Sequence, residues 1–144
     1  MRVFIALIAL YTTMATARSW EGIVIHHSAS PEWTTVQDID AWHRERGFTG
    51  VGYHYVIEHS GRIRVGRPID QQGAHAKTGK SYSRNATHIG ICLVGNESFT
   101  EVQLVSLRRL VKRLRQAYPI VSVEPHHEEC PGHGVPSDIF EWLP

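Results

Sequence analysis

Hydrophobic and polar positions along this chain alternate in a way that predicts short strands separated by two longer helices. Short apolar runs rich in β-branched residues are typical of buried strands. Such runs occupy residues 22–26, 52–58, 88–94 and 120–123. A turn at residues 59–61, followed by the alternating segment 62–66, predicts a hairpin partner with one face in water.

The first helical pattern begins at Thr34 or Thr35, either of which can serve as an N-cap. It runs to about Arg46, and Gly47 lies just beyond its end. Four of its residues fall on one face, and we expect them to pack rather than to form a site: Val36, Ile39, Trp42 and His43.

The second helical pattern begins at Thr100, and Gln103 three residues later completes a capping-box signal. Its basic residues are expected on a solvated face, opposite an apolar stripe that faces the core. The stripe comprises Leu104, Leu107, Leu110, Val111 and Leu114. Ser137 is expected to cap a short final helix that carries Ile139, Phe140 and Trp142.

The order of these elements predicts a single α/β domain, with a mixed central β-sheet flanked by helices on both faces. Residues 67–87 are rich in Gly, Ser, Lys and Gln and are predicted to form a long loop. Loops of that length within a compact domain tend to be functional or disordered.

The N-terminal residues have the parts of a secretory signal peptide: a charge at Arg2, an apolar stretch, and the small residues Ala15 and Ala17. We expect cleavage after Ala17, which gives residues 1–17 as signal peptide, residues 18–144 as the mature domain, and a secreted or periplasmic protein. The alternatives are a buried N-terminal element and a transient membrane anchor. The apolar stretch is too short to span a bilayer as a stable helix.

Composition and charge limit the classes of partner that this protein is expected to bind. The 144 residues carry a formal net charge of +1 and no long basic run, so nucleic acid is not an expected partner. The mature chain is large enough to bury a core without disulfides, and we expect a monomer. Of the two cysteines, Cys92 lies inside an apolar run and is expected to be a small buried hydrophobe.

The candidate chemistry lies in two histidine pairs that are far apart in the sequence. His26 and His27 end one predicted strand, whereas His126 and His127 follow another and precede Cys130. One imidazole from each pair and a thiolate make three ligands for Zn²⁺, and the fourth tetrahedral position is left to water, as in catalytic sites. Successive strand residues point to opposite faces, so only one histidine of each pair should reach the metal.

Several motifs in order resemble the type 2 N-acetylmuramoyl-L-alanine amidases, a family that includes amidase-type phage lysozymes and peptidoglycan recognition proteins. The motifs cover nearly all of the mature chain. They are Ile25–Ser30, Val51–Tyr55, Gly73–Lys77, Ile89–Gly95, His126–Glu128 and Cys130–Gly132.

The resemblance implies a zinc hydrolase that cuts the amide between N-acetylmuramic acid and L-alanine in bacterial peptidoglycan. It places His26, His126 and Cys130 at the zinc ligands, Tyr53 beside the metal, and His75 in the substrate groove. It also implies the mixed sheet flanked by helices.

This chain departs from the family pattern in one loop. Fewer residues separate His126 from Cys130 than in most members, and Glu128 stands where some phage members have a catalytic lysine. We expect Tyr53 to stabilise the oxyanion. We expect Glu128 to transfer the proton, with a histidine as the alternative carrier. The alternative function is a recognition module that binds peptidoglycan without cleaving it; such members often lack the cysteine, so Cys130 favours the enzyme.

Overall fold

A computed structural model describes residues 18–76 and 84–141, so the predicted signal peptide, residues 77–83 and Trp142 lie outside the described part. A five-stranded sheet has the order β3-β2-β4-β1-β5. Its strands are β1 Gly22–His27, β2 Tyr55–Ile57, β3 Ile63–Val65, β4 His88–Leu93 and β5 Ser122–Pro125. Among the strand pairs of the described residues, only the β2–β3 hairpin is antiparallel, which confirms the predicted mixed sheet.

Both long helices begin where their capping signals predicted. Helix α1, Val36–Glu45, is capped by Thr35, and helix α2, Glu101–Ala117, is capped by Thr100. Each cap closes a reciprocal capping box, which satisfies backbone donors that a helix start otherwise leaves free. The short elements are α3, Asp138–Glu141, and the 3₁₀ turn η1, Arg84–Ala86.

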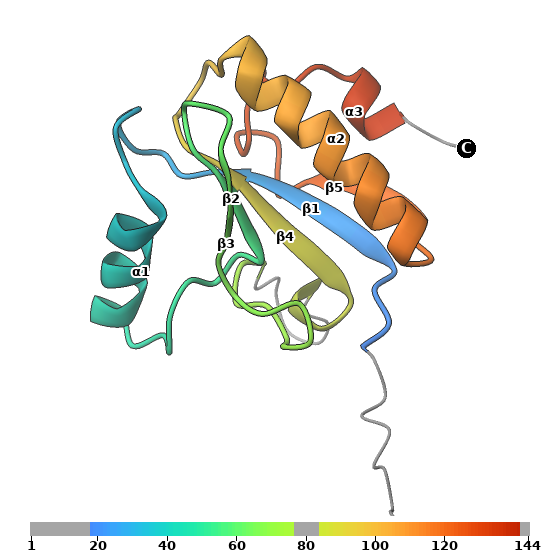
Figure 1. Ribbon diagram of the computed structural model, residues 1–144, viewed down its shortest axis with the longest axis horizontal. Coiled ribbons are helices and arrows are strands. Elements are labelled where there is room, and N and C mark those ends of the chain that lie inside the picture. Colours follow the sequence, from blue (N-terminus) through green and yellow to red (C-terminus); the bar gives the residue numbers. More distant parts are fainter. Residues whose placement is uncertain (1–17, 77–83, 142–144) are drawn as a thin grey trace, which may run out of the picture.

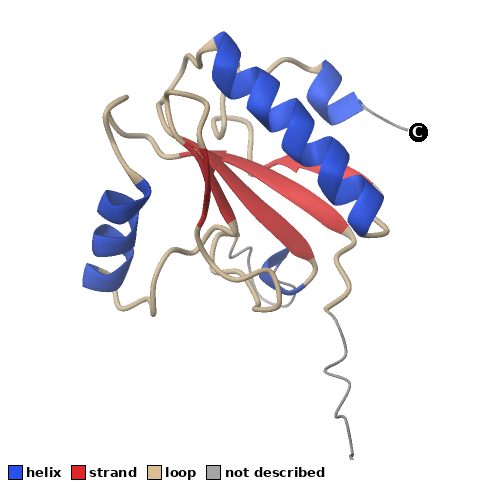
Figure 2. Cartoon of the chain, viewed as in Figure 1, coloured by secondary structure: helices blue, strands red, loops and turns tan. Residues whose placement is uncertain are grey.

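The helices cover opposite faces of the sheet, as predicted (Figures 1 and 2). The larger core lies under α2 and α3, and includes Ile23 and Ile25 of β1 together with Leu107 of α2. A smaller core under α1 joins Ile39 to Cys92. The buried Cys92 therefore packs as the sequence predicted.

Strand alternation decides on which face the candidate chemistry lies. Ile25 faces α2, so the next residue of β1, His26, points to the α1 face. His26 is in register with Cys92 of β4, whose side chain packs in the α1 core. The α1 side of the sheet therefore carries the site.

Several details differ from the sequence predictions. Strand β5 was predicted at residues 120–123 but occupies Ser122–Pro125. Trp42 was expected to pack on α1, but 43% of it is exposed. Strand β2 begins only at Tyr55, so Tyr53 lies in the irregular segment before it. The reason is tertiary: the amides of Val51 and Gly52 donate to Asp40 Oδ1 and His43 Nδ1 of α1 rather than to a neighbouring strand.

The predicted apolar faces of the two long helices are otherwise confirmed. Val36, Ile39 and His43 are buried on α1, and the apolar stripe of α2 is buried throughout. Within residues 18–76 and 84–141, no helix combines the length and hydrophobicity needed to cross a bilayer.

Candidate metal centre

Three side chains predicted as metal ligands meet at one end of the sheet. One potential ligand atom from each of His26, His126 and Cys130 lies within 4.8 Å of the others. His26 Nδ1 is 4.0 Å from Cys130 Sγ, and the rings of His26 and His126 have centroids 4.5 Å apart. Two imidazole nitrogens and one sulfur form a donor set that suits zinc.

Parallel pairing of β1 with β5 brings these donors together, although His26 and Cys130 are 104 positions apart. The amide of His126 donates to the carbonyl of Ile25, which continues the ladder past the end of β5. A tight turn then returns the chain, because His127 and Cys130 exchange backbone hydrogen bonds of 3.0 Å in both directions. The short loop therefore still brings the thiol to the imidazoles.

The second histidine of each pair lies outside the cluster. The backbone amide of His27 donates to Cys130 Sγ over 3.5 Å, while its Nδ1 is 3.2 Å from the carbonyl of Pro131. The exposed His127 lies at the turn, with its ring centroid 4.7 Å from that of His126. Both residues support or flank the loop. The sequence left His27 and His127 open as alternative ligands, but the structure brings His26 and His126 to Cys130 instead.

A cavity of about 750 Å³ adjoins the cluster, and Tyr53, His43 and His75 help to line it. The ring of Tyr53 stacks at a tilt against His26, with centroids 5.0 Å apart. His43 anchors the segment that carries Tyr53, because His43 Nδ1 accepts a hydrogen bond from the neighbouring amide of Gly52 over 2.9 Å. The predicted tyrosine therefore stands beside the cluster, on a segment anchored by α1.

Contacts that the sequence did not indicate place the ring of His75 in the site. Its Nδ1 is 2.9 Å from His26 Nε2, and its Nε2 is 3.1 Å from the carbonyl of His88. Asn85 Oδ1 accepts from the amides of His75 and Ala76, both over 2.7 Å.

Arg84 holds the other side of the site. Its guanidinium donates to the carbonyl of His126 over 2.7 Å and to Glu124 Oε2 over 3.0 Å. Arg84 and Asn85 lie in a region without hydrophobic periodicity, so no pattern in the sequence identified them. The turn η1 thus fixes two segments of the site through adjacent residues.

Burial governs the protonation of the site. Burial, followed by the positive charge of neighbouring histidines and Arg84, holds the pKa of His26 well below its ordinary value. Burial also lowers the pKa of His75 to about 3, and raises the pKa of the Cys130 thiol in the metal-free state. The pKa of Tyr53 is raised by burial and then by the nearby sulfurs of Cys92 and Cys130, so its phenol stays protonated. Neutral imidazoles are the form that ligates a metal.

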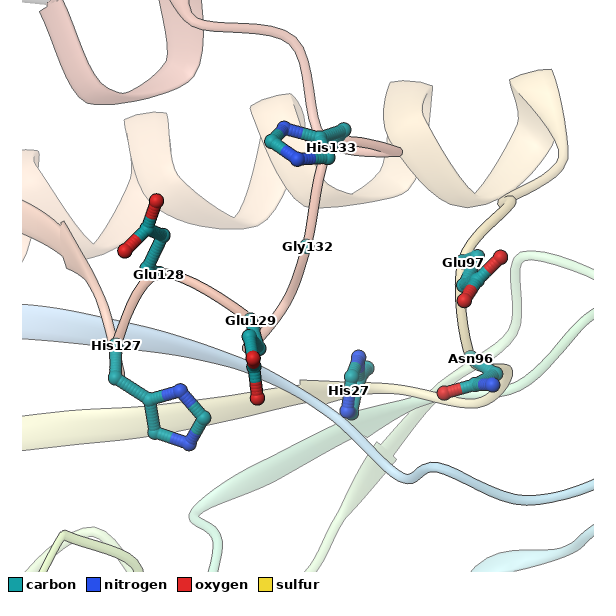
Figure 3. A pocket seen from close by; sticks show the side chains of 8 residues that line it. All are labelled: His27, Asn96, Glu97, His127, Glu128, Glu129, Gly132 and His133. Atoms are coloured by element: carbon teal, nitrogen blue, oxygen red, sulfur yellow. The ribbon is translucent and has the colours of Figure 1, made fainter.

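Glu128 lies on the other side of the turn. It is exposed and lines a neighbouring cavity of about 840 Å³, together with Glu97, Glu129 and His133. His27 and His127 border both cavities. Figure 3 shows the side chain of Glu128 directed away from that of His127. Glu128 is not among the residues that line the cavity beside the three donors.

Comparison with known proteins decides the family. Residues 16–133 match the family model described as N-acetylmuramoyl-L-alanine amidase. The chain belongs to this amidase family. The amidase is similar to the endolysin of Escherichia phage T7, with 34% identity over 134 residues, 86% of this chain and 85% of the relative.

Solved structures agree with this assignment. The amidase LysC from Clostridium intestinale superposes with a TM-score of 0.76 at 35% identity, covering 84% of this chain and 83% of that one. Drosophila PGRP-LB superposes with a TM-score of 0.72 at 26% identity, covering 86% and 81%. The protein is therefore an endolysin-type N-acetylmuramoyl-L-alanine amidase, which acts on peptidoglycan, and its fold is that of the peptidoglycan recognition proteins.

Proposed function

We propose that this amidase uses one zinc ion, held by His26, His126 and Cys130, to hydrolyse the bond between N-acetylmuramic acid and L-alanine. The observation that carries the proposal is the convergence of two imidazoles and one thiol within 4.8 Å. Three protein donors leave one tetrahedral position for water, as catalytic zinc sites require. A zinc ion bound there would polarise the amide carbonyl and lower the pKa of a bound water toward ~7.

The protein supplies the remaining parts of the reaction. Tyr53 lines the same cavity and its phenol stays protonated, so it can donate to the carbonyl oxygen as negative charge develops there. The cavity of about 750 Å³ has room for the sugar–peptide junction beside the cluster. His75 lines this cavity too, and its contact with substrate, expected from the resemblance, remains a prediction.

The proton-transfer role of Glu128 also remains a prediction. A carboxylate can carry a proton to the leaving nitrogen, and such help is worth ~10²–10⁴ in rate. Glu128 borders the neighbouring cavity, so water or movement of the turn would have to connect it with the reaction. The substitution Glu128→Gln removes the base with little change of shape. An unchanged rate of wall digestion between pH 6 and 8 would assign the proton to another group.

Metal analysis tests the zinc proposal directly. We expect about one zinc per wild-type chain, and loss of zinc from His26→Ala and Cys130→Ala. His59→Ala is a matched control, because His59 is not one of the clustered donors and its Nε2 lies 3.4 Å from Glu32 Oε2. Zymography on cell walls should show a chelator-sensitive band for the wild type and none for the two ligand variants. Full zinc occupancy in either ligand variant would refute the assignment.

We also propose that the amidase is exported and loses residues 1–17. The support is the charged start, apolar stretch and small residues of that segment. Mass spectrometry of the exported protein should give a chain that begins at Arg18. An intact Met1 on protein confined to the cytoplasm would contradict export.

A further inference from the structure

The hydrogen bonds of His75 determine where its protons lie. His75 Nε2 is 3.1 Å from the backbone oxygen of His88, and a carbonyl oxygen can only accept. The hydrogen of a neutral His75 must therefore be on Nε2. Its Nδ1 then has a lone pair, and accepts a hydrogen bond from the atom that faces it, His26 Nε2, at 2.9 Å.

The same bond determines the tautomer of His26. With its hydrogen on Nε2, His26 carries its lone pair on Nδ1, the atom that lies 4.0 Å from Cys130 Sγ. The opposite arrangement fails. If His75 donated from Nδ1 to His26 Nε2, a neutral His26 would carry its hydrogen on Nδ1 and offer no lone pair on the side of Cys130.

The protein holds the His75 ring in place from several directions. A Cβ atom added at either Gly73 or Gly90 would lie 2.5 Å from His75 Cδ2, so the ring fills space that only glycines leave open. The amide of His75 is fixed by Asn85 Oδ1. The ring is thus confined at the position where its Nδ1 meets His26.

We infer that His75 is a positioning residue, which fixes the tautomer of His26 so that Nδ1 is presented to the metal. This inference rests on the proposed zinc site and deepens it. Metal-bound histidines commonly donate their second ring hydrogen to a fixed acceptor, and loss of such a partner typically costs ~10–100-fold in metal affinity. Here the acceptor is itself an imidazole, whose other nitrogen is held by the backbone.

The tautomer can be measured without any metal. Long-range ¹H–¹⁵N NMR of the metal-free wild-type protein should show His26 protonated on Nε2 and His75 protonated on Nε2. Protonation of His26 on Nδ1 would overturn the inference. This measurement is independent of the zinc proposal: a wild-type protein with the expected tautomer that bound no zinc would refute the proposed metal centre only.

Two polar variants separate the two ring nitrogens of His75. His75→Asn places an amide oxygen near the position of Nδ1 and keeps an acceptor for His26. His75→Gln keeps a polar group near the position of Nε2 but removes that acceptor. Zinc affinity, measured by competition with a chromophoric chelator, should fall by ~10–100-fold in the Gln variant and by much less in the Asn variant.

Controls make this comparison specific. His59→Asn should leave zinc affinity unchanged, and thermal unfolding of the metal-free proteins should show that both His75 variants fold. NMR should show a mixture of His26 tautomers in the Gln variant and the Nε2–H form in the Asn variant. Equal zinc affinity in the wild type and both variants, or greater loss in the Asn variant, would refute the positioning role.

Discussion

The guanidinium of Arg84 donates to the backbone carbonyl of His126 over 2.7 Å, although the two residues are 42 positions apart. The same side chain pairs with Glu124 of β5, and only 18% of it is exposed. One cation from η1 therefore secures the segment that leaves β5 and carries a metal-ligand candidate. The geometry of the cluster depends on a residue that contributes no atom to it.

Replacement of Arg84 with Met should weaken both the fold and the metal site. The carbonyl of His126 would lose a charged donor, and Glu124 would lose one of its partners while keeping the hydrogen bond from Ser122 Oγ. Loss of a hydrogen bond to a charged group costs about 1.5–3 kcal/mol in unfolding free energy. Urea unfolding of the metal-free protein should show this loss, and chelator competition should show weaker zinc binding. Arg109→Met, on the exposed face of α2, is the control and should change neither quantity.

Tyr53→Phe should retain zinc and fold but slow amide cleavage by roughly a hundredfold or more, the usual effect of removing one oxyanion donor. The control is Tyr55→Phe, because Tyr55 packs against the core under α2, on the other face of the sheet. Zinc content and the rate of wall digestion should be measured together. A Phe variant with the wild-type rate and full zinc would make Tyr53 a packing residue.

His27→Ala and His127→Ala should both keep bound zinc. The contact between residue 27 and Cys130 Sγ comes from the backbone amide and survives truncation of the side chain. His27→Ala loses the bond to the Pro131 carbonyl, so it should lower zinc affinity more than His127→Ala. Metal analysis after dialysis measures the zinc that each variant retains. Loss of zinc from His127→Ala with zinc retained in His126→Ala would reverse the ligand assignment.

Acid should destabilise the metal-free protein through its buried histidines. Burial lowers the pKa of His54 to about 4, whereas an imidazole in the unfolded chain titrates near 6.5. Between these values the unfolded state binds more protons than the folded state, so the free energy of unfolding falls as pH drops. The loss is on the order of 1.4 kcal/mol per pH unit for each such histidine.

Urea unfolding at pH 7.5, 6 and 5 measures this slope. Stability should be full above pH ~7 and decline below the unfolded-state pKa of ~6.5. His54→Gln removes one titrating group, so its stability should decline less steeply over the same range. A stability that does not change between pH 7 and pH 5 would contradict the prediction.

The features that the sequence predicted well depend on local physics. Capping boxes at Thr35 and Thr100 involve residues three positions apart, and the stripe of α2 follows from helical periodicity. The three metal-ligand candidates could be named because each stands next to a recognisable strand or loop signal. A resemblance to known motifs then favoured one histidine of each pair.

The features that the sequence missed depend on contacts between distant segments. Strand β2 begins later than predicted because side chains of α1 accept hydrogen bonds from the amides before it. Trp42 is exposed because α1 turns Val36, Ile39 and His43 toward the sheet instead. The bond between His26 and His75 joins residues 49 positions apart, and His75 lies in a loop that has no periodic pattern. Tertiary geometry alone brings such pairs together.

The pairing of β1 with β5 has a consequence for biosynthesis. His26 lies in the first strand of the sheet, whereas His126 and Cys130 follow the last one, so the donors meet only after β5 has joined β1. Closing so long a segment is costly in chain entropy and is compensated only by the contacts formed afterwards. A partly synthesised chain that lacks β5 holds one of the three donors. The donor cluster is therefore assembled only when the sheet is complete, and an immature chain lacks two of its three members.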